Sequence, residues 1–105
     1  IGGFNIYTKE VEQVLVEHAD VADAAVVGVP DDIYGEAVAA FIECRPGRNP
    51  DVEAIQEHTR SRIASYKKPK HVFFVDALPR NGVGKVLKAE LREMALVRLA
   101  QPAVA

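Results

Sequence analysis

The chain has 105 residues, of which 49% are apolar and 27% charged, and this balance fits one soluble domain with a single hydrophobic core. Its formal net charge of -2 argues against a dedicated nucleic-acid-binding domain, which is usually strongly basic. One cysteine, Cys44, excludes a disulfide framework, and we interpret it as a small core residue in a reducing, cytoplasmic compartment rather than a catalytic thiol. No apolar run approaches the roughly 20 residues of a membrane span. Because the first residue is Ile1, we expect a piece of a longer protein that works with a partner domain.

The N-terminal region predicts a short strand followed by a helix. Gly2-Gly3 form a flexible start, and residues 4–7 (Phe4-Asn5-Ile6-Tyr7) alternate loosely enough for a strand. Thr8 has the chemistry of a helix N-cap. The apolar face of a helix from about 8 to 18 follows at Val11, Val14, Leu15 and His18.

Two runs rich in Val and Ala, at residues 21–29 and 35–44, predict two strands. A turn at Pro30-Asp31-Asp32 separates them, so we expect an antiparallel pair. We interpret the carboxylates of this turn, with Glu36, as solvated rather than as a metal cluster. His18 is likewise interpreted as a hydrogen-bonded residue at a helix end, because no other histidine lies at ligand spacing from it.

A second helix is predicted from about 50 to 63, with Asn49 as N-cap, Pro50 at the first helical position and Asp51 as an early acid. Its apolar face is Val52, Ile55, Thr59 and Ile63. The only basic region, residues 60–70, follows and includes Tyr66-Lys67-Lys68-Pro69-Lys70. Two interpretations stay open for this region, a solvated helix end or a site for a phosphorylated ligand.

Residues 71–75 are β-branched and aromatic and predict a third strand. A last helix is predicted from Leu87, Leu91, Met94 and Ala95, with Leu99 continuing its face and Pro102 ending it. The fold class that follows is α+β. We expect a small antiparallel or mixed sheet of about three strands flanked by about three helices, with a short extra hairpin.

That hairpin is the lysine loop, residues 79–85 (Pro79-Arg80-Asn81-Gly82-Val83-Gly84-Lys85). Proline fixes one backbone angle and two glycines free others, so the lysine is presented on a short loop. Two interpretations stay open, a hairpin turn with a solvated lysine or a phosphate site. A P-loop is excluded, because Pro79 stands where its first glycine belongs and Val86 where its hydroxyl belongs.

Several motifs in the right order resemble the C-terminal domain of acyl-adenylate-forming (AMP-binding) enzymes. They are Gly2-Gly3-Phe4-Asn5-Ile6-Tyr7 leading into Glu10-Val11-Glu12, Val26-Val27-Gly28-Val29-Pro30-Asp31, Tyr34-Gly35-Glu36, Tyr66-Lys67-Lys68-Pro69, and the lysine loop leading into Lys88 and Leu91-Arg92. The resemblance implies that residues 1–105 are a mobile C-terminal domain. The N-terminal domain that binds ATP and the acyl group, and the hinge, would lie outside this chain, so the chain would be inactive alone.

The resemblance also implies the roles of particular residues. Lys85 would be the catalytic lysine of adenylation, where an ammonium between carboxylate and phosphate lowers their repulsion. Gly2 and Gly3 would line the tunnel for the pantetheine arm of CoA, with Phe4 and Asn5 near that tunnel or the nucleotide. ATP and CoA would be co-substrates, and Mg²⁺ would be bound with ATP by the N-terminal domain.

Among the relatives, the stretch Pro79-Arg80-Asn81-Gly82-Val83-Gly84-Lys85-Val86-Leu87-Lys88 is more similar to the carboxylic acid–CoA ligases of fatty and aryl acids. It lacks the threonine and the Asp-Arg pair that peptide-synthetase adenylation domains usually carry there. An acid–thiol ligase of the acyl-CoA synthetase type is therefore the expected function. Two alternatives remain, an adenylation domain that loads a carrier protein and a non-catalytic module that binds a nucleotide or a protein.

Overall fold

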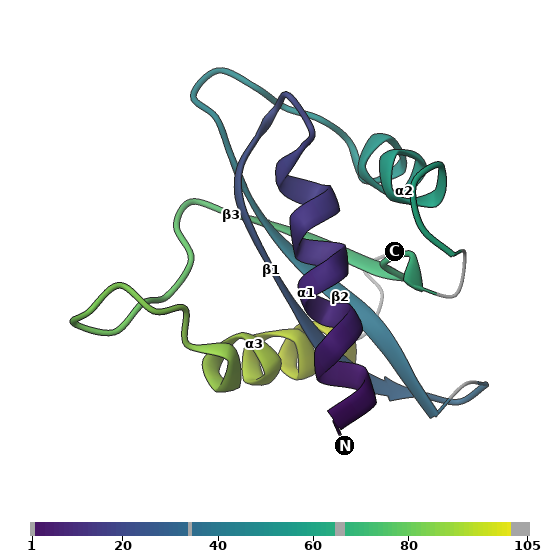
Figure 1. Ribbon diagram of the computed structural model, residues 1–105. Helices are drawn as coiled ribbons and strands as arrows, with labels where there is room; N and C mark the ends of the chain where they lie inside the picture. The colour runs from purple at the N-terminus through teal and green to yellow at the C-terminus, as the bar shows by residue number, and fades with distance from the viewer. Residues whose placement is uncertain (1, 34, 65–66, 102–105) are drawn as a thin grey trace.

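The computed structural model describes residues 2–33, 35–64 and 67–101, and of residues 2–7 the backbone alone. Within these ranges the chain forms three helices and three strands. In chain order they are α1 (Gly2–Val16), β1 (Val21–Asp31), β2 (Gly35–Cys44), α2 (Val52–Arg60), β3 (His71–Val75) and α3 (Lys88–Ala100). The strands form one sheet in the order β1-β2-β3, so β2 is central (Figure 1). The predicted α+β class is therefore confirmed.

The sheet is mixed. Strands β1 and β2 pair antiparallel, from Val21 opposite Cys44 to Asp31 opposite Gly35, as predicted for two strands joined by a turn. Strands β2 and β3 pair parallel, from Ala39 beside His71 onward. A parallel neighbour requires a crossover connection, and the segment that contains α2 provides it.

Both faces of the sheet are buried, which explains why β1 and β2 read as unbroken apolar runs rather than as alternating ones. Helices α1 and α2 cover one face, through Val11, Leu15 and Ile55. Helix α3 covers the other face, through Leu91 and Ala95. Successive strand residues point to opposite faces. Accordingly, the first layer takes Ala24, Val26, Val38, Ala40 and Ile42, and the second takes Ala25, Val27, Val29, Ala37, Ala39 and Phe41.

The structure corrects the prediction for the N-terminal residues. Residues 4–7 form no strand and Thr8 is no N-cap, because α1 already begins at Gly2. Thr8 is only 6% exposed and lies about one helical turn before Val11, so it belongs to the buried face of α1 rather than to a cap. A loose alternation over four residues is a weaker signal than this helical periodicity, and no proline interrupts it.

The start of α2 is also corrected. Asp51, not Asn49, is the N-cap: it has extended backbone angles, and its Oδ1 accepts a hydrogen bond from the backbone N–H of Ala54 at 2.7 Å. The helix ends at Arg60, before the predicted residue 63. The carbonyl of Thr59 then accepts hydrogen bonds from the N–H groups of both Arg62 and Ile63 at 3.0 Å, which closes the last turn tightly.

The apolar faces of α2 and α3 are shorter than the sequence pattern predicts. Val52 is 38% exposed and Leu99 is 40% exposed, because only the middle turns of each helix lie over the sheet. Tyr66 and the predicted helix stop at Pro102 lie outside the described residues. Among the residues that are described, no helix is long and apolar enough to cross a membrane.

The core substitution expected to lower the free energy of unfolding most lies on the central strand, β2. Phe41 is fully buried on β2, and its ring lies 5.1 Å from that of Phe73. We expect Phe41→Ala to lower the free energy of unfolding by about 3–5 kcal/mol, because it leaves a cavity between β2 and α3. Urea unfolding followed by circular dichroism measures this. Ile33→Ala, at a position 77% exposed, is the control, and an equal loss there would contradict the assigned core.

The two candidate caps of α2 can be separated in the same assay. Asp51→Ala removes the hydrogen bond to the N–H of Ala54, so we expect a loss of about 1 kcal/mol. Asn49→Ala should stay within about 0.5 kcal/mol, as for surface substitutions away from caps. The reverse order of effects would return the cap to Asn49.

Candidate functional site

The lysine loop is the turn of a short hairpin between β3 and α3. The N–H of Leu87 donates to the carbonyl of Pro79 at 2.9 Å, and the N–H of Asn81 donates to the carbonyl of Lys85 at 2.9 Å. Arg80 and Val86 face each other as an antiparallel bridge. The predicted extra hairpin is therefore confirmed, and it projects from the body of the molecule (Figure 1).

Asn81 gives this turn a defined shape. Its side-chain Oδ1 accepts hydrogen bonds from the N–H groups of Val83 and Lys85, both at 3.0 Å, and its carbonyl accepts one from Gly84. Gly84 has a φ of +87°, in the left-handed region that glycine adopts without strain. The backbone conformation at position 84 thus explains why a glycine stands there. The hydrogen bonds of Asn81 make the loop more ordered than its two glycines suggest.

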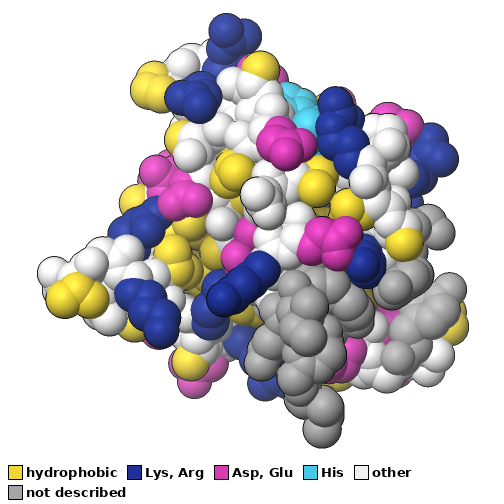
Figure 2. Space-filling view, viewed as in Figure 1, with side chains coloured by type: hydrophobic (Ala, Val, Ile, Leu, Met, Phe, Trp, Pro, Cys, Tyr) yellow, Lys and Arg dark blue, Asp and Glu magenta, His cyan; other side chains and the backbone are white. Residues whose placement is uncertain are grey.

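The Lys85 side chain is exposed on this hairpin, next to a tip formed by Val83, which is 89% exposed. Figure 2 shows the projecting tip with a hydrophobic side chain on it. Within the described part of the chain, no hydrogen bond or ion pair holds the Lys85 ammonium. By contrast, Lys67 contacts Glu10. The hairpin therefore presents a cation with no intramolecular partner among the described residues.

The outer edge of β1 connects α1 to α3. An edge strand leaves backbone groups unpaired, and side chains fill these positions here. Glu12 of α1 accepts a hydrogen bond from the N–H of Val26 at 2.7 Å. Lys88, the first residue of α3, donates to the carbonyl of Val26 at 2.8 Å and contacts the carboxylate of Glu12. Arg92 donates to the carbonyl of Gly28 at 3.1 Å.

Two further carboxylates hold the beginning of the lysine loop. Glu43 of β2 accepts a hydrogen bond from the N–H of Leu78 at 3.1 Å. Asp23 of β1 forms an ion pair with Arg80, and Arg80 also donates to the carbonyl of Gly84 at 3.1 Å. Sequence reasoning missed Asp23 and Glu43. The available signal was a carboxylate within each of two strands otherwise rich in apolar residues.

The N-terminal site residues predicted from the resemblance, Gly2, Gly3, Phe4 and Asn5, form the first turn of α1 rather than a loop. Helix α1 is connected to the lysine hairpin further along, where Glu12 contacts Lys88. The two predicted parts of the site are thus joined through α1 and the edge of β1.

The basic region is largely paired with carboxylates. Arg60 contacts Glu57 at 2.7 Å, Lys67 contacts Glu10 at 2.6 Å, and Lys70 contacts Asp31. These contacts favour the structural interpretation of the region over a ready-made phosphate site. The interpretation of Asp31 as a solvated turn carboxylate was therefore wrong, because its side chain is only 3% exposed and pairs with Lys70.

The surroundings of His18, His58 and Cys44 fit structural roles for these residues. The Nδ1 atom of His18 accepts a hydrogen bond from the N–H of Asp20 at 3.0 Å, as expected for a histidine at a helix end. Its ring meets that of His58 edge to face at 4.9 Å, a contact that the sequence did not indicate. Burial, together with nearby Asp20, raises the pKa of the Cys44 thiol, which disfavours a reactive thiolate.

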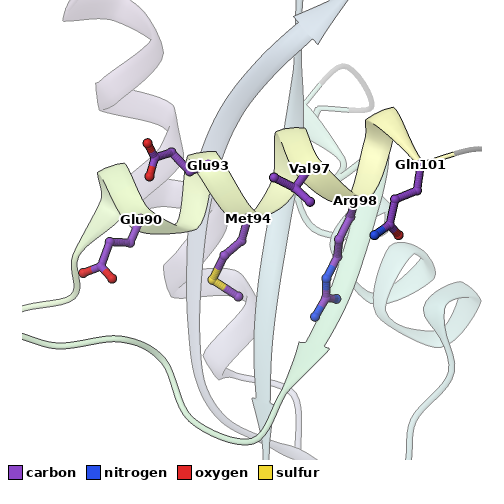
Figure 3. A pocket seen from close by; sticks show the side chains of 6 residues that line it. All are labelled: Glu90, Glu93, Met94, Val97, Arg98 and Gln101. Atoms are coloured by element: carbon purple, nitrogen blue, oxygen red, sulfur yellow. The ribbon is translucent and has the colours of Figure 1, made fainter.

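A shallow hollow of about 410 Å³ runs along the exposed side of α3. It is lined by Glu90, Glu93, Met94, Val97, Arg98 and Gln101 (Figure 3). The Arg98 guanidinium lies over the Phe73 ring at 5.2 Å, which covers part of the sheet. None of the predicted site residues lines this hollow, so it lies apart from the lysine hairpin.

In comparisons with known proteins, the chain is similar to part of several ligases and synthetases. The chain is 53% identical over 93 residues to a methyl-dioxo-octahydroindenyl-propanoyl:CoA ligase from Mycobacterium tuberculosis, covering 89% of this chain and 18% of the relative. It is 42% identical over 93 residues to a fatty acid–acyl-carrier-protein ligase from Streptomyces coeruleorubidus, covering 89% and 18%. The structure superposes on an amide bond synthetase from Marinactinospora thermotolerans with a TM-score of 0.81 and 41% identity, covering 84% and 18%.

The chain therefore spans less than a fifth of the length of these relatives. The sequence profile described as the AMP-binding enzyme C-terminal domain matches residues 10–85, which begin in α1 and end at Lys85. This match covers most of the chain and agrees with the hairpin, the mixed sheet and the relatives. The chain belongs to the family of AMP-binding enzyme C-terminal domains.

Proposed function

We propose that residues 1–105 are the mobile C-terminal domain of an ATP-dependent carboxylic acid–CoA ligase, and that Lys85 is its catalytic residue for acyl adenylation. The observation that carries this proposal is an exposed ammonium, without an intramolecular partner among the described residues, on an ordered hairpin of this family. Such a cation is available for a ligand that another domain supplies. The 53% identical relative is named as a CoA ligase, which supports the choice of acceptor.

In the first half-reaction, a carboxylate oxygen of the acid attacks the α-phosphorus of ATP. The bond from this phosphorus to the bridging oxygen breaks, and acyl-adenylate and pyrophosphate form. Both reactants are anionic, so the Lys85 ammonium between them lowers their repulsion and stabilises the charge of the transition state. A lysine suits this role because it is a compact charge on a flexible stem, and it acts here without transferring a proton.

In the second half-reaction, the CoA thiol attacks the acyl carbon and AMP leaves. We propose that the domain turns for this step, so that Lys85 withdraws and the N-terminal end of α1 approaches the thiol. Gly2 and Gly3 would then line the pantetheine tunnel, because a residue without Cβ lets a slender ligand approach the backbone. Phe4 and Asn5 would lie beside the tunnel or the nucleotide.

The remaining requirements fall on an N-terminal domain, the proposed partner of this chain. Among the described residues no group of three His, Cys, Asp or Glu side chains is placed to hold a metal ion. As the family resemblance implies, we assign Mg²⁺, bound with ATP, to that domain, together with the acyl pocket. ATP, CoA and a carboxylic acid are the proposed substrates, and the cytoplasm, where both co-substrates are found, is the proposed location.

A carrier protein is the second candidate acceptor. It is favoured by the relative named as a fatty acid–acyl-carrier-protein ligase, which matches the same 89% of the chain. The two acceptors share the pantetheine thiol and differ in what surrounds it. Offering the complete enzyme CoA and a pantetheinylated carrier protein in parallel, with the acid and ATP, separates them by the rate of thioester formation.

The role of Lys85 predicts a split between the half-reactions. In the complete enzyme, Lys85→Ala should slow adenylation by about 3 kcal/mol in activation free energy, on the order of 100-fold. Thioester formation from supplied acyl-adenylate should be largely retained. Pyrophosphate release measures the first step and thioester formation the second. Lys9→Ala, which removes an exposed lysine of α1, is the matched control; equal loss of both half-reactions in Lys85→Ala would contradict the assignment.

The role of Gly3 predicts the opposite split. Gly3→Leu should spare adenylation and slow thioester formation, because the added side chain would occupy the pantetheine path. The same pair of assays on the complete enzyme checks this. Normal thioester production by Gly3→Leu would remove Gly3 from the proposed tunnel.

A further inference from the structure

The hairpin that carries Lys85 is fastened to β1 by a side chain of its own. Arg80 extends one nitrogen to the carboxylate of Asp23 and another to the carbonyl of Gly84, which immediately precedes Lys85. One guanidinium therefore touches both the edge strand and the residue before the catalytic lysine. Its planar fork allows these two contacts at once, which a lysine could not reproduce with the same geometry.

We propose that Arg80 is a positioning residue for adenylation, and that the Asp23–Arg80 pair fixes the direction in which the hairpin presents Lys85. This inference rests on the proposed function of Lys85. A projecting hairpin needs such a connection because its own hydrogen bonds define its internal shape but not its angle to the sheet. Asn81 provides the internal bonds, and Arg80 provides the external one.

The hairpin is also held at both of its ends. Leu78, just before the lysine loop, is buried and bound to Glu43. Lys88, just after the hairpin, is bound to Glu12 and to the carbonyl of Val26. Both ends of the hairpin are thus anchored. Between these anchors, Val86 packs against the apolar layer that includes β1, and among the described residues Arg80 makes the polar side-chain contact with β1.

The Asp23–Arg80 pair should matter for the position of Lys85 more than for the stability of the fold. Arg80 and Asp23 are each about a third exposed, and exposed ion pairs contribute little to folding. A displacement of about 1 Å at a catalytic group, however, can cost on the order of 100-fold in rate. Loss of the pair should therefore affect the step that uses Lys85 much more than it affects the fold.

The test uses the complete enzyme with the charge-removing variants Arg80→Gln, Asp23→Asn and the double variant. Each single variant should slow adenylation about ten-fold or more, while thioester formation from supplied acyl-adenylate and the Tm remain close to those of the unmodified enzyme. The double variant should be no slower than the slower single one, because both changes break the same contact. Arg48→Gln is the matched control, since it breaks an ion pair, with Asp20 at 3.5 Å, that involves no residue of the hairpin.

Asp23→Asn is the decisive variant, because Asp23 lies on β1 and not on the hairpin. If Arg80 acted directly on ATP, Arg80→Gln alone would slow adenylation and Asp23→Asn would not, which would overturn the positioning role. Equal loss of both half-reactions, or adenylation unchanged in both single variants, would also overturn it. Lys85→Ala, run beside them, separates the claims: if it slows adenylation while the Arg80 and Asp23 variants do not, the proposed function stands and this inference fails.

Discussion

The arrangement of this domain depends on one constraint, the unpaired outer edge of β1. An edge strand must have its backbone groups satisfied, and here Glu12, Lys88 and Arg92 do so. These side chains come from the first helix and the last one, so satisfying the strand also joins the two ends of the chain. The same strand supplies Asp23 to the lysine hairpin.

This constraint explains how a small domain can hold the proposed catalytic charge on a projecting hairpin. The sheet is buried on both faces, so it forms a rigid base for the hairpin. The lysine loop is ordered by Asn81 and Gly84, yet the Lys85 side chain stays exposed. Proposed movement would then take place between this domain and its N-terminal partner, with the hairpin carried as a rigid part. Adenylation would take place while the Lys85 ammonium lies in the active site of the N-terminal domain, and it would stop when the hairpin moves away.

The sequence predicted most of the fold, because its signals were strong where burial is strong. The runs at residues 21–29 and 35–44 are apolar on both faces and predicted β1 and β2, and β3 was predicted at its observed bounds. The predicted N-terminal strand was wrong, because a four-residue alternation is a weaker signal than the helical periodicity of α1. The cap of α2 was wrong by two residues, since Asn49 and Asp51 have similar capping chemistry and only the backbone angles separate them.

The candidate site was predictable only in part. Lys85 and its hairpin follow from local sequence, because proline, asparagine and glycine act on neighbouring backbone. Asp23 lies 57 residues from its partner Arg80, and Glu43 lies 35 residues from Leu78. Glu12 lies 76 residues from Lys88. No local pattern indicates contacts at such separations. Contacts of this kind emerge only when the fold brings distant segments of the chain side by side. The roles of Gly2 and Gly3 come from the family resemblance alone, and they stay a prediction.

In the proposed mechanism, Lys85 acts in the first half-reaction and is absent from the second. A single-turnover quenched-flow experiment on the complete enzyme, with labelled acid, ATP and CoA present together, follows both intermediates in one time course. In Lys85→Ala the account predicts slow formation of acyl-adenylate and its conversion to thioester at the unmodified rate, so that adenylate does not accumulate. Accumulation of acyl-adenylate in this variant would contradict the account, because it would place Lys85 in the thiol step instead.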